Sequence, residues 1–269
     1  MAGFATSSEN EELRRALDDD AEILLKCCGA ERVNHFGHAW ASSYVKEELE
    51  LEVLYSKEEG SSLYRFMGVC RFKNMQAVDL MQFLYDLKRR LTWDANCCNL
   101  NSHFICEWPV EGAERSAIVV PSDQCMMFRC ETRAVGPVSA RDFVDINYLR
   151  HNLDSAGQVE SVISVGGHTP ALTKIMNDKY SDVFPESSAC VRGVTSGGCG
   201  WYCVQEKDSS GAFTGDVIMH YVIHSDLKGW MPSAILNATV GGTYVDFFKA
   251  VKESLVKEGW KKAPSQPST

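Results

Sequence analysis

Apolar residues recur at helical spacing in three stretches of the chain: at its start, around residue 80 and near its end. Ser8 and Glu11 form a capping box for a first helix, which is expected to end at Gly29. Asn74 is placed to cap a second helix with one stripe of leucines. A last helix is predicted to begin near Pro232. Its apolar stripe consists of Leu236, Val240, Tyr244, Phe247, Val251 and Leu255.

Between the helices, apolar and polar residues alternate, which is typical of strands with one buried face. Residues 49–71 predict a hairpin around a turn at residues 59–62. Further strands are expected at residues 101–108, 116–120, 125–132, 142–149, 158–165, 191–194, 200–205 and 216–224. Many strands joined by short turns favour an antiparallel, curved sheet, so the predicted fold class is α+β. We expect one domain over residues 9–259, a flexible N-terminus at residues 1–8 and a disordered tail at residues 260–269.

The charge and composition of the chain exclude some classes of function. The 27 basic and 36 acidic side chains give a net charge of −9, which argues against binding to nucleic acid. No apolar run is long enough for a membrane-spanning helix, and the first residues lack the pattern of a secretion signal. We therefore expect a cytoplasmic protein. In a reducing compartment, most of the 11 cysteines are expected to be free thiols used as small apolar residues.

Several residues could in principle carry chemistry. Cys199 and Cys203, with Cys190 and His168 earlier in the chain, suggest a zinc site, but no second close pair completes a tetrahedral set. A catalytic thiol paired with His103, His168 or His220 stays open, although nothing in the local sequence activates one cysteine over the others. The glycine pairs lack the spacing of nucleotide-binding loops. We therefore predict no metal, no cofactor and no enzymatic activity.

A curved sheet beside a long apolar helix has two possible interiors. The sheet can curl around the helix and leave an apolar cavity, which is a common setting for a small-molecule site. Alternatively, the helix fills a packed core. Hydrophobic periodicity does not distinguish these two arrangements. Gly241 and Gly242 interrupt the middle of the helix, and each lowers helix stability by about 1 kcal/mol relative to alanine.

Four groups of residues carry a resemblance to a known family. They are Leu91-Thr-Trp-Asp94, Gly136-Pro-Val-Ser-Ala-Arg-Asp-Phe-Val-Asp145, Cys190-Val-Arg-Gly193 followed by Cys199-Gly-Trp-Tyr-Cys203, and Ser225-Asp-Leu-Lys-Gly-Trp-Met-Pro232 followed by Val245-Asp-Phe247. In this order they resemble the START (StAR-related lipid-transfer) family, closest to its small cytosolic sterol-type and bile-acid-type members. The resemblance extends over about residues 49–259. It implies a helix-grip fold, in which a nine-stranded antiparallel sheet wraps around the C-terminal helix and encloses one lipid.

The resemblance also implies which residues face the lipid. Where steroidogenic members have an arginine paired with an acidic residue of the preceding strand, this chain has Asn147, with Met127 or Phe128 near the acidic position. Asn147 offers a donor and an acceptor to a hydroxyl group, and Asp145 shares its strand face. A buried Asp145 needs a partner, so we expect it at an edge or bound to water. The implied ligand-binding set is Met127, Phe128, Asp145, Asn147, Val240, Tyr244, Phe247 and Val251.

The function that follows from this resemblance is lipid binding and transfer. We expect a cytosolic carrier of one hydrophobic ligand, with a sterol favoured, which contacts membrane surfaces transiently. The absence of the family's ion pair keeps carotenoid, phospholipid and ceramide open as cargo. A helix-grip enzyme or a ligand-gated interaction module is the alternative. Residues 133–140 resemble the family's gating loop.

Overall fold

The computed structural model describes residues 8–116, 120–134, 139–228 and 233–259. The tail expected at residues 260–269 lies outside these ranges, as do all but the last of the residues in the expected flexible N-terminus, 1–8. Parts of the expected strand at 116–120 and of the expected gating loop at 133–140 are also outside them. Among the described residues, no helix is both long and apolar enough to span a membrane.

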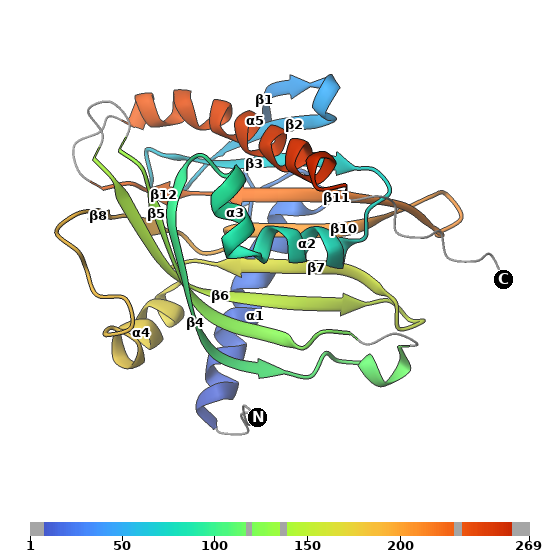
Figure 1. Ribbon diagram of the computed structural model, residues 1–269, viewed down its shortest axis with the longest axis horizontal. Helices are drawn as coiled ribbons and strands as arrows, with labels where there is room; N and C mark the ends of the chain where they lie inside the picture. The colour runs from blue at the N-terminus through green and yellow to red at the C-terminus, as the bar shows by residue number, and fades with distance from the viewer. Residues whose placement is uncertain (1–7, 117–119, 135–138, 229–232, 260–269) are drawn as a thin grey trace.

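One long antiparallel sheet forms the body of the protein (Figure 1). From edge to edge its strands are β1 (Ala41–Lys46), β2 (Leu51–Lys57), β3 (Tyr64–Phe72), β11 (Phe213–Ile223), β10 (Gly200–Lys207), β7 (Val159–Gly166), β6 (Arg141–Leu153), β5 (Asp123–Thr132) and β4 (Cys97–Trp108). The short strand β8 (Val191–Arg192) pairs in parallel with β6, outside this path. β9 (Val194–Thr195) and β12 (Ser225–Asp226) form a separate small ladder. The expected antiparallel sheet of nine consecutive partners is therefore confirmed.

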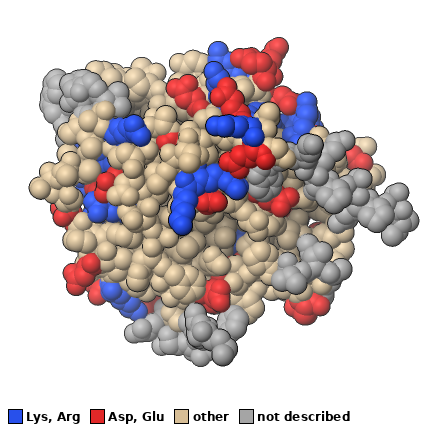
Figure 2. Space-filling view, in the orientation of Figure 1, with Lys and Arg blue, Asp and Glu red and all other residues tan. Residues whose placement is uncertain are grey.

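Helices cover both faces of the sheet. They are α1 (Ser8–Cys28), α2 (Ala77–Tyr85), α3 (Leu87–Trp93), α4 (Pro170–Lys179) and α5 (Ser233–Lys257), with short 3-10 turns η1 (Glu47–Leu49) and η2 (Ala113–Arg115). Figure 1 shows α5, α2 and α3 in front of the sheet and α1 behind it. This arrangement is the helix-grip fold expected from the sequence. On the face seen in Figure 2, basic and acidic side chains intermingle, and neither sign forms a continuous patch.

Strand alternation divides the apolar interior into two cores. On one face, residues of β3, β10 and β11 pack with α2 and α5. On the other face, residues of β5, β6 and β7 pack with α1 and α4. In β6, for example, Val144, Ile146 and Tyr148 are buried on the α1 side. The intervening Asp145 and Asn147 must then face the α5 side, because successive side chains of a strand point in opposite directions.

The second predicted helix is broken into two. Asn74 does not cap it but has a left-handed backbone with φ 53°, and α2 begins three residues later. Asp86 is extended, and its carboxylate accepts a hydrogen bond from the Arg89 backbone N–H at 3.0 Å. This side chain therefore caps a new helix, α3, instead of continuing the old one. The leucine stripe ends accordingly, and Leu91 is exposed.

Three further differences have local causes. The strand expected at 191–194 is divided into β8 and β9 at Gly193, where an added Cβ would lie 2.4 Å from the Phe143 ring. Helix α4 was not expected, although Thr169 accepts a hydrogen bond from Leu172 N at 3.2 Å and Pro170 follows it, a standard start for a helix. Strand β1 was also not expected, because its residues are mostly exposed and lack a buried alternation.

The two glycines of α5 occupy different environments. The helix continues through both positions. Gly241 is buried, and a Cβ added there would lie 2.2 Å from Cε2 of Tyr44 in β1. Gly242 is exposed, and nothing lies within 4 Å of its added Cβ. Gly241 thus permits a close approach between α5 and β1, whereas Gly242 only weakens the helix.

We predict opposite effects of alanine at these two positions. Gly242→Ala should raise the free energy of unfolding by about 1 kcal/mol, because alanine restricts the unfolded backbone and meets no neighbour. Gly241→Ala should give no such gain, because the Tyr44 ring has to move. Urea denaturation of both variants measures this difference. An equal gain in both variants would show that the contact between α5 and β1 imposes no constraint.

Candidate functional site

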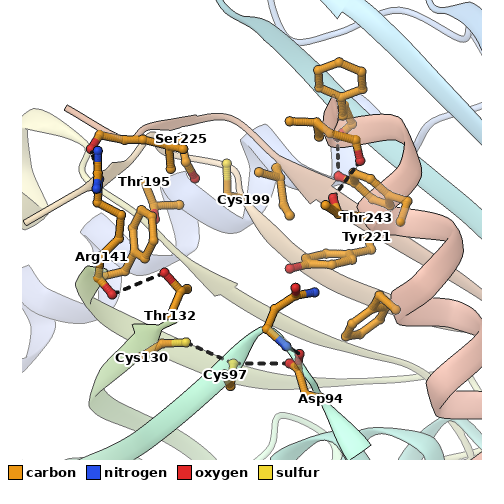
Figure 3. Close-up of a pocket in the computed structure, with 18 of the residues that line it drawn as sticks. Asp94, Cys97, Cys130, Thr132, Arg141, Thr195, Cys199, Tyr221, Ser225 and Thr243 are labelled. Atoms are coloured by element: carbon orange, nitrogen blue, oxygen red, sulfur yellow. Dashed lines mark hydrogen bonds between the residues drawn. The ribbon is translucent and has the colours of Figure 1, made fainter. Parts of the chain in front are cut away.

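A cavity of about 750 Å³ lies between α5, the α2–α3 segment and the face of the sheet that they cover (Figure 3). Its volume is in the range of small-molecule sites. Its aromatic wall consists of Tyr64, Phe66, Tyr85, Phe128, Phe143, Trp201, Tyr221, Tyr244 and Phe247. Of the two interiors that the sequence allowed, the structure has the cavity.

Six of the eight predicted ligand-binding residues line this cavity: Phe128, Asp145, Asn147, Val240, Tyr244 and Phe247. The other two do not. Met127 points to the opposite face of the sheet and is buried with the α1 core, because it precedes the inward-facing Phe128 on the same strand. Val251, one turn beyond Phe247 in α5, is fully buried in the apolar core on the α5 side. Contact between the six wall residues and a ligand stays a prediction.

A cluster of three polar side chains interrupts the apolar wall. The Oδ1 atom of Asn147 accepts hydrogen bonds from the Tyr85 hydroxyl and from Ser164 Oγ, the latter at 3.1 Å. The hydroxyl oxygens of Tyr85 and Ser164 lie 2.7 Å apart. Burial raises the pKa of Tyr85, so its hydroxyl keeps its proton. Gly166 makes room for this cluster, since an added Cβ would lie 2.8 Å from Asn147 Nδ2.

Asp145 lies beside this cluster on the same face of β6 and has a partner behind the wall. Its Oδ1 atom is 3.4 Å from Nε2 of His168. Burial opposes protonation of His168, but the hydrogen bond and the negative charge of Asp145 outweigh it, so the pKa of His168 is raised. The partly buried Asp145 therefore has a histidine as its ion-pair neighbour rather than an edge position, and Nε2 of the same histidine is 3.1 Å from the Val144 carbonyl oxygen.

The residues considered for zinc and for thiol chemistry lie in different surroundings. Within the described ranges, His, Cys, Asp and Glu side chains form no group of three or more that could hold a metal ion. Cys199 lines the cavity, but burial raises the pKa of its thiol to about 12. His220 stacks on Tyr202, and burial lowers its pKa to about 4. A thiol held in its neutral form is a poor nucleophile.

The two buried arginines of the wall are both engaged with the protein itself. Arg90 Nε is 3.0 Å from Oδ2 of Asp94, and its guanidinium lies 5.0 Å from the centre of the Trp201 ring. Arg141 donates to the backbone carbonyls of Ser139, Leu227 and Lys228. Arg141 thus joins the end of the 133–140 loop to the segment that leads into α5.

Tyr85, Ser164 and His168 are functional candidates that the sequence did not single out for binding. Tyr85 follows the apolar stripe of α2, and Ser164 lies within an apolar strand, so neither carries a local signal. His168 stood out only as a metal or catalytic candidate. All three acquire their roles from contacts between segments that are distant in the chain, for example 62 residues between Tyr85 and Asn147.

A curved antiparallel sheet that holds a C-terminal helix over an apolar cavity defines a helix-grip ligand-binding domain. The START domain family model matches residues 31–261, and the chain belongs to this family. START domains bind and transfer lipids. A search of curated proteins gave no match.

Solved structures share the fold at low sequence identity. Human StAR-related lipid transfer protein 5 is 14% identical, with a TM-score of 0.66 over 93% of this chain and 99% of that chain. Human STARD10 is 14% identical, with a TM-score of 0.56 over 97% of this chain and 84% of that chain. A STAR-related lipid transfer protein fragment from Xanthomonas axonopodis is 20% identical, with a TM-score of 0.54 over 81% of this chain and 98% of that chain.

Neighbouring residues on opposite sides of β5 should respond differently to alanine. Phe128→Ala should weaken binding of a fluorescent lipid about three- to tenfold, because it removes an aromatic contact from the cavity wall. Met127→Ala should lower the free energy of unfolding by about 2–5 kcal/mol and leave the affinity of the folded protein unchanged. Ligand titration and urea denaturation of both variants test this. Equal losses of affinity would contradict the assignment of the two faces.

Proposed function

We propose that this protein encloses one neutral lipid in the cavity, with a sterol favoured, and carries it through the cytosol between membranes. The observation that supports this most is the combination of an apolar cavity with one small uncharged cluster, Tyr85–Ser164–Asn147, in its wall. The lipid would contact Phe128, Asp145, Asn147, Val240, Tyr244 and Phe247.

A sterol matches this cavity in shape and in chemistry. It is a rigid apolar body with a single hydroxyl group, and its several hundred Å² of apolar surface provide on the order of 10 kcal/mol when removed from water. The hydroxyl of a bound sterol can join the Tyr85–Ser164–Asn147 cluster, which contains both donors and acceptors. Burying that hydroxyl without such a partner would cost about 1–3 kcal/mol.

The charges of the wall favour a neutral lipid over a phospholipid. A buried phosphate needs charge-assisted hydrogen bonds, most often from arginine. Of the three arginines that line the cavity, Arg90 is paired with Asp94 and Arg141 is bonded to three backbone carbonyls. The third, Arg133, is exposed to solvent. A phosphate near Asp145 would in addition meet a carboxylate. Ceramide and carotenoid are also uncharged and remain the alternative cargo.

Loading is proposed to occur at the α5 end of the cavity, in transient contact with a membrane. Tyr64 and Ile235 both line the cavity, yet their exposed fractions are 39% and 53%. Apolar side chains that are both exposed and part of a cavity wall are suited to an opening. We propose that transfer involves no chemical step, in keeping with the raised pKa of the Cys199 thiol in this wall.

Hydroxyl recognition can be separated from apolar burial by one matched pair of variants. Tyr85→Phe should weaken sterol binding about three- to tenfold, because it removes a hydrogen-bonding group worth about 1 kcal/mol. It should leave unchanged the affinity for the same sterol skeleton without its hydroxyl. Tyr55→Phe is the control, since Tyr55 lies in β2 outside the cavity wall.

Fluorescence titration of the two ligands against the three proteins provides the measurement. Equal weakening of both ligands by Tyr85→Phe would argue against recognition of the hydroxyl. Failure of the unsubstituted protein to bind either ligand, or to move sterol between vesicles, would argue against sterol as the cargo.

A further inference from the structure

Two cysteines from neighbouring strands meet in the cavity wall. Cys97 is the first residue of β4, and Cys130 lies in β5. Their sulfur atoms are 3.2 Å apart, and both side chains line the cavity (Figure 3). Cys97 is only 3% exposed and Cys130 is partly buried, and the cavity is a space that both side chains border.

A local irregularity of the sheet brings the two thiols together. The pairing of β4 with β5 shifts between Cys97 and Asn99. Cys97 is therefore opposite Thr132, whereas Cys130 is opposite Leu100, and the two cysteines face each other diagonally across the bulge. At this separation a disulfide requires only a small movement of the two side chains.

The surroundings favour a negative charge on one of the two sulfur atoms. The Cys97 thiol donates a hydrogen bond to Oδ2 of Asp94 at 3.2 Å and also contacts the Cys130 sulfur. This sulfur contact and the nearby Arg90 guanidinium lower the pKa of Cys130, and they outweigh burial and the carboxylates of Asp94 and Asp145. The same sulfur contact and burial raise the pKa of Cys97. Cys130 is thus the nucleophile of the pair, and Cys97 keeps its proton.

We propose that Cys97 and Cys130 form an oxidation site, at which a hydroperoxide that enters the cavity converts the two thiols into a disulfide. In the first step the Cys130 thiolate attacks one peroxide oxygen, the O–O bond breaks, and the leaving oxygen takes up a proton. The products are a sulfenic acid on Cys130 and water or an alcohol. In the second step Cys97 attacks the sulfenic sulfur and releases water. Two thiols are oxidised and one peroxide is reduced.

A second cysteine pair on the same strands provides an internal control. Cys106 of β4 is directly opposite Cys125 of β5, and their thiols are hydrogen-bonded. This pair lies in the α1 core, with exposed fractions of 6% and 0%, and it is not part of the cavity wall. No cation contributes to its electrostatic surroundings. In both pairs the two sulfur atoms are close together. Only the Cys97–Cys130 pair borders the cavity and has a cation, Arg90, nearby.

The proposal also predicts that cargo protects the thiols. A lipid in the cavity would cover Cys97 and Cys130 and slow their oxidation. This part rests on the proposed function, whereas oxidation of the empty protein does not. A comparison of empty protein with protein whose lipid loading has been verified by mass therefore separates failure of the oxidation site from failure of the proposed lipid binding.

The test is treatment of the full-length, delipidated protein with hydrogen peroxide, followed by intact-mass measurement and peptide mapping. We expect loss of two hydrogens, a Cys97–Cys130 disulfide formed at least about tenfold faster than a Cys106–Cys125 disulfide, and reversal by a dithiol reductant. Cys130→Ser should abolish this product. Cys98→Ser, which changes the exposed neighbour of Cys97, should not.

Peptide mapping of the unsubstituted protein tests the proposed oxidation site even if a variant does not fold. The proposal is overturned if Cys106–Cys125 oxidises as fast as Cys97–Cys130. It is also overturned if peroxide modifies exposed thiols such as Cys98 while Cys97 and Cys130 stay reduced. If empty and loaded protein form the disulfide equally fast, the proposal that peroxide reaches the two thiols through the lipid-binding cavity is wrong.

Discussion

Side chains of a strand alternate between two faces, and this constraint determines how the protein is built. Each central strand presents one set of apolar residues to α1 and α4 and another set to α5 and α2. The first set is closely packed. On the second side the sheet curves around α5, and the helix covers the sheet without filling the space beneath it, which leaves the cavity. The cavity and the core beneath α1 therefore lie on opposite faces of the same strands, as Phe128 and Met127 illustrate.

Several polar groups of the cavity wall are bonded to other protein groups. Asn147 is bonded to Tyr85 and Ser164, Asp145 is paired with His168, and Arg141 is bonded to three carbonyls. Such bonding offsets the cost of burying these groups. It also limits what the cavity can recognise, because the side chains of Arg90 and Arg141 already bond to protein groups. The group best suited to a ligand is the uncharged hydroxyl and amide cluster.

The sequence predicted the parts of this structure that depend on local pattern. Alternation indicated the β2–β3 hairpin, helical spacing indicated α1 and α5, and the ordered motifs indicated the family. The alternation of side chains along a strand correctly placed Asp145 and Asn147 on the same face of the sheet. The rest depends on contacts between distant segments. Nothing near Tyr85 indicates that it meets Ser164, 79 residues later, or that His168 lies behind Asp145. The break at Asp86 was missed because the leucine spacing continues across it, although its carboxylate caps α3.

The central claim is that the cavity holds one neutral lipid, and the most direct test is mass spectrometry. The protein would be purified from a lipid-rich eukaryotic host, weighed in its native state and then extracted with organic solvent. We predict one lipid per chain, identified after extraction as a sterol or another uncharged lipid. A stoichiometric phospholipid would contradict the argument from the paired arginines. An empty protein that also takes up no lipid from liposomes would contradict the lipid-carrier account as a whole.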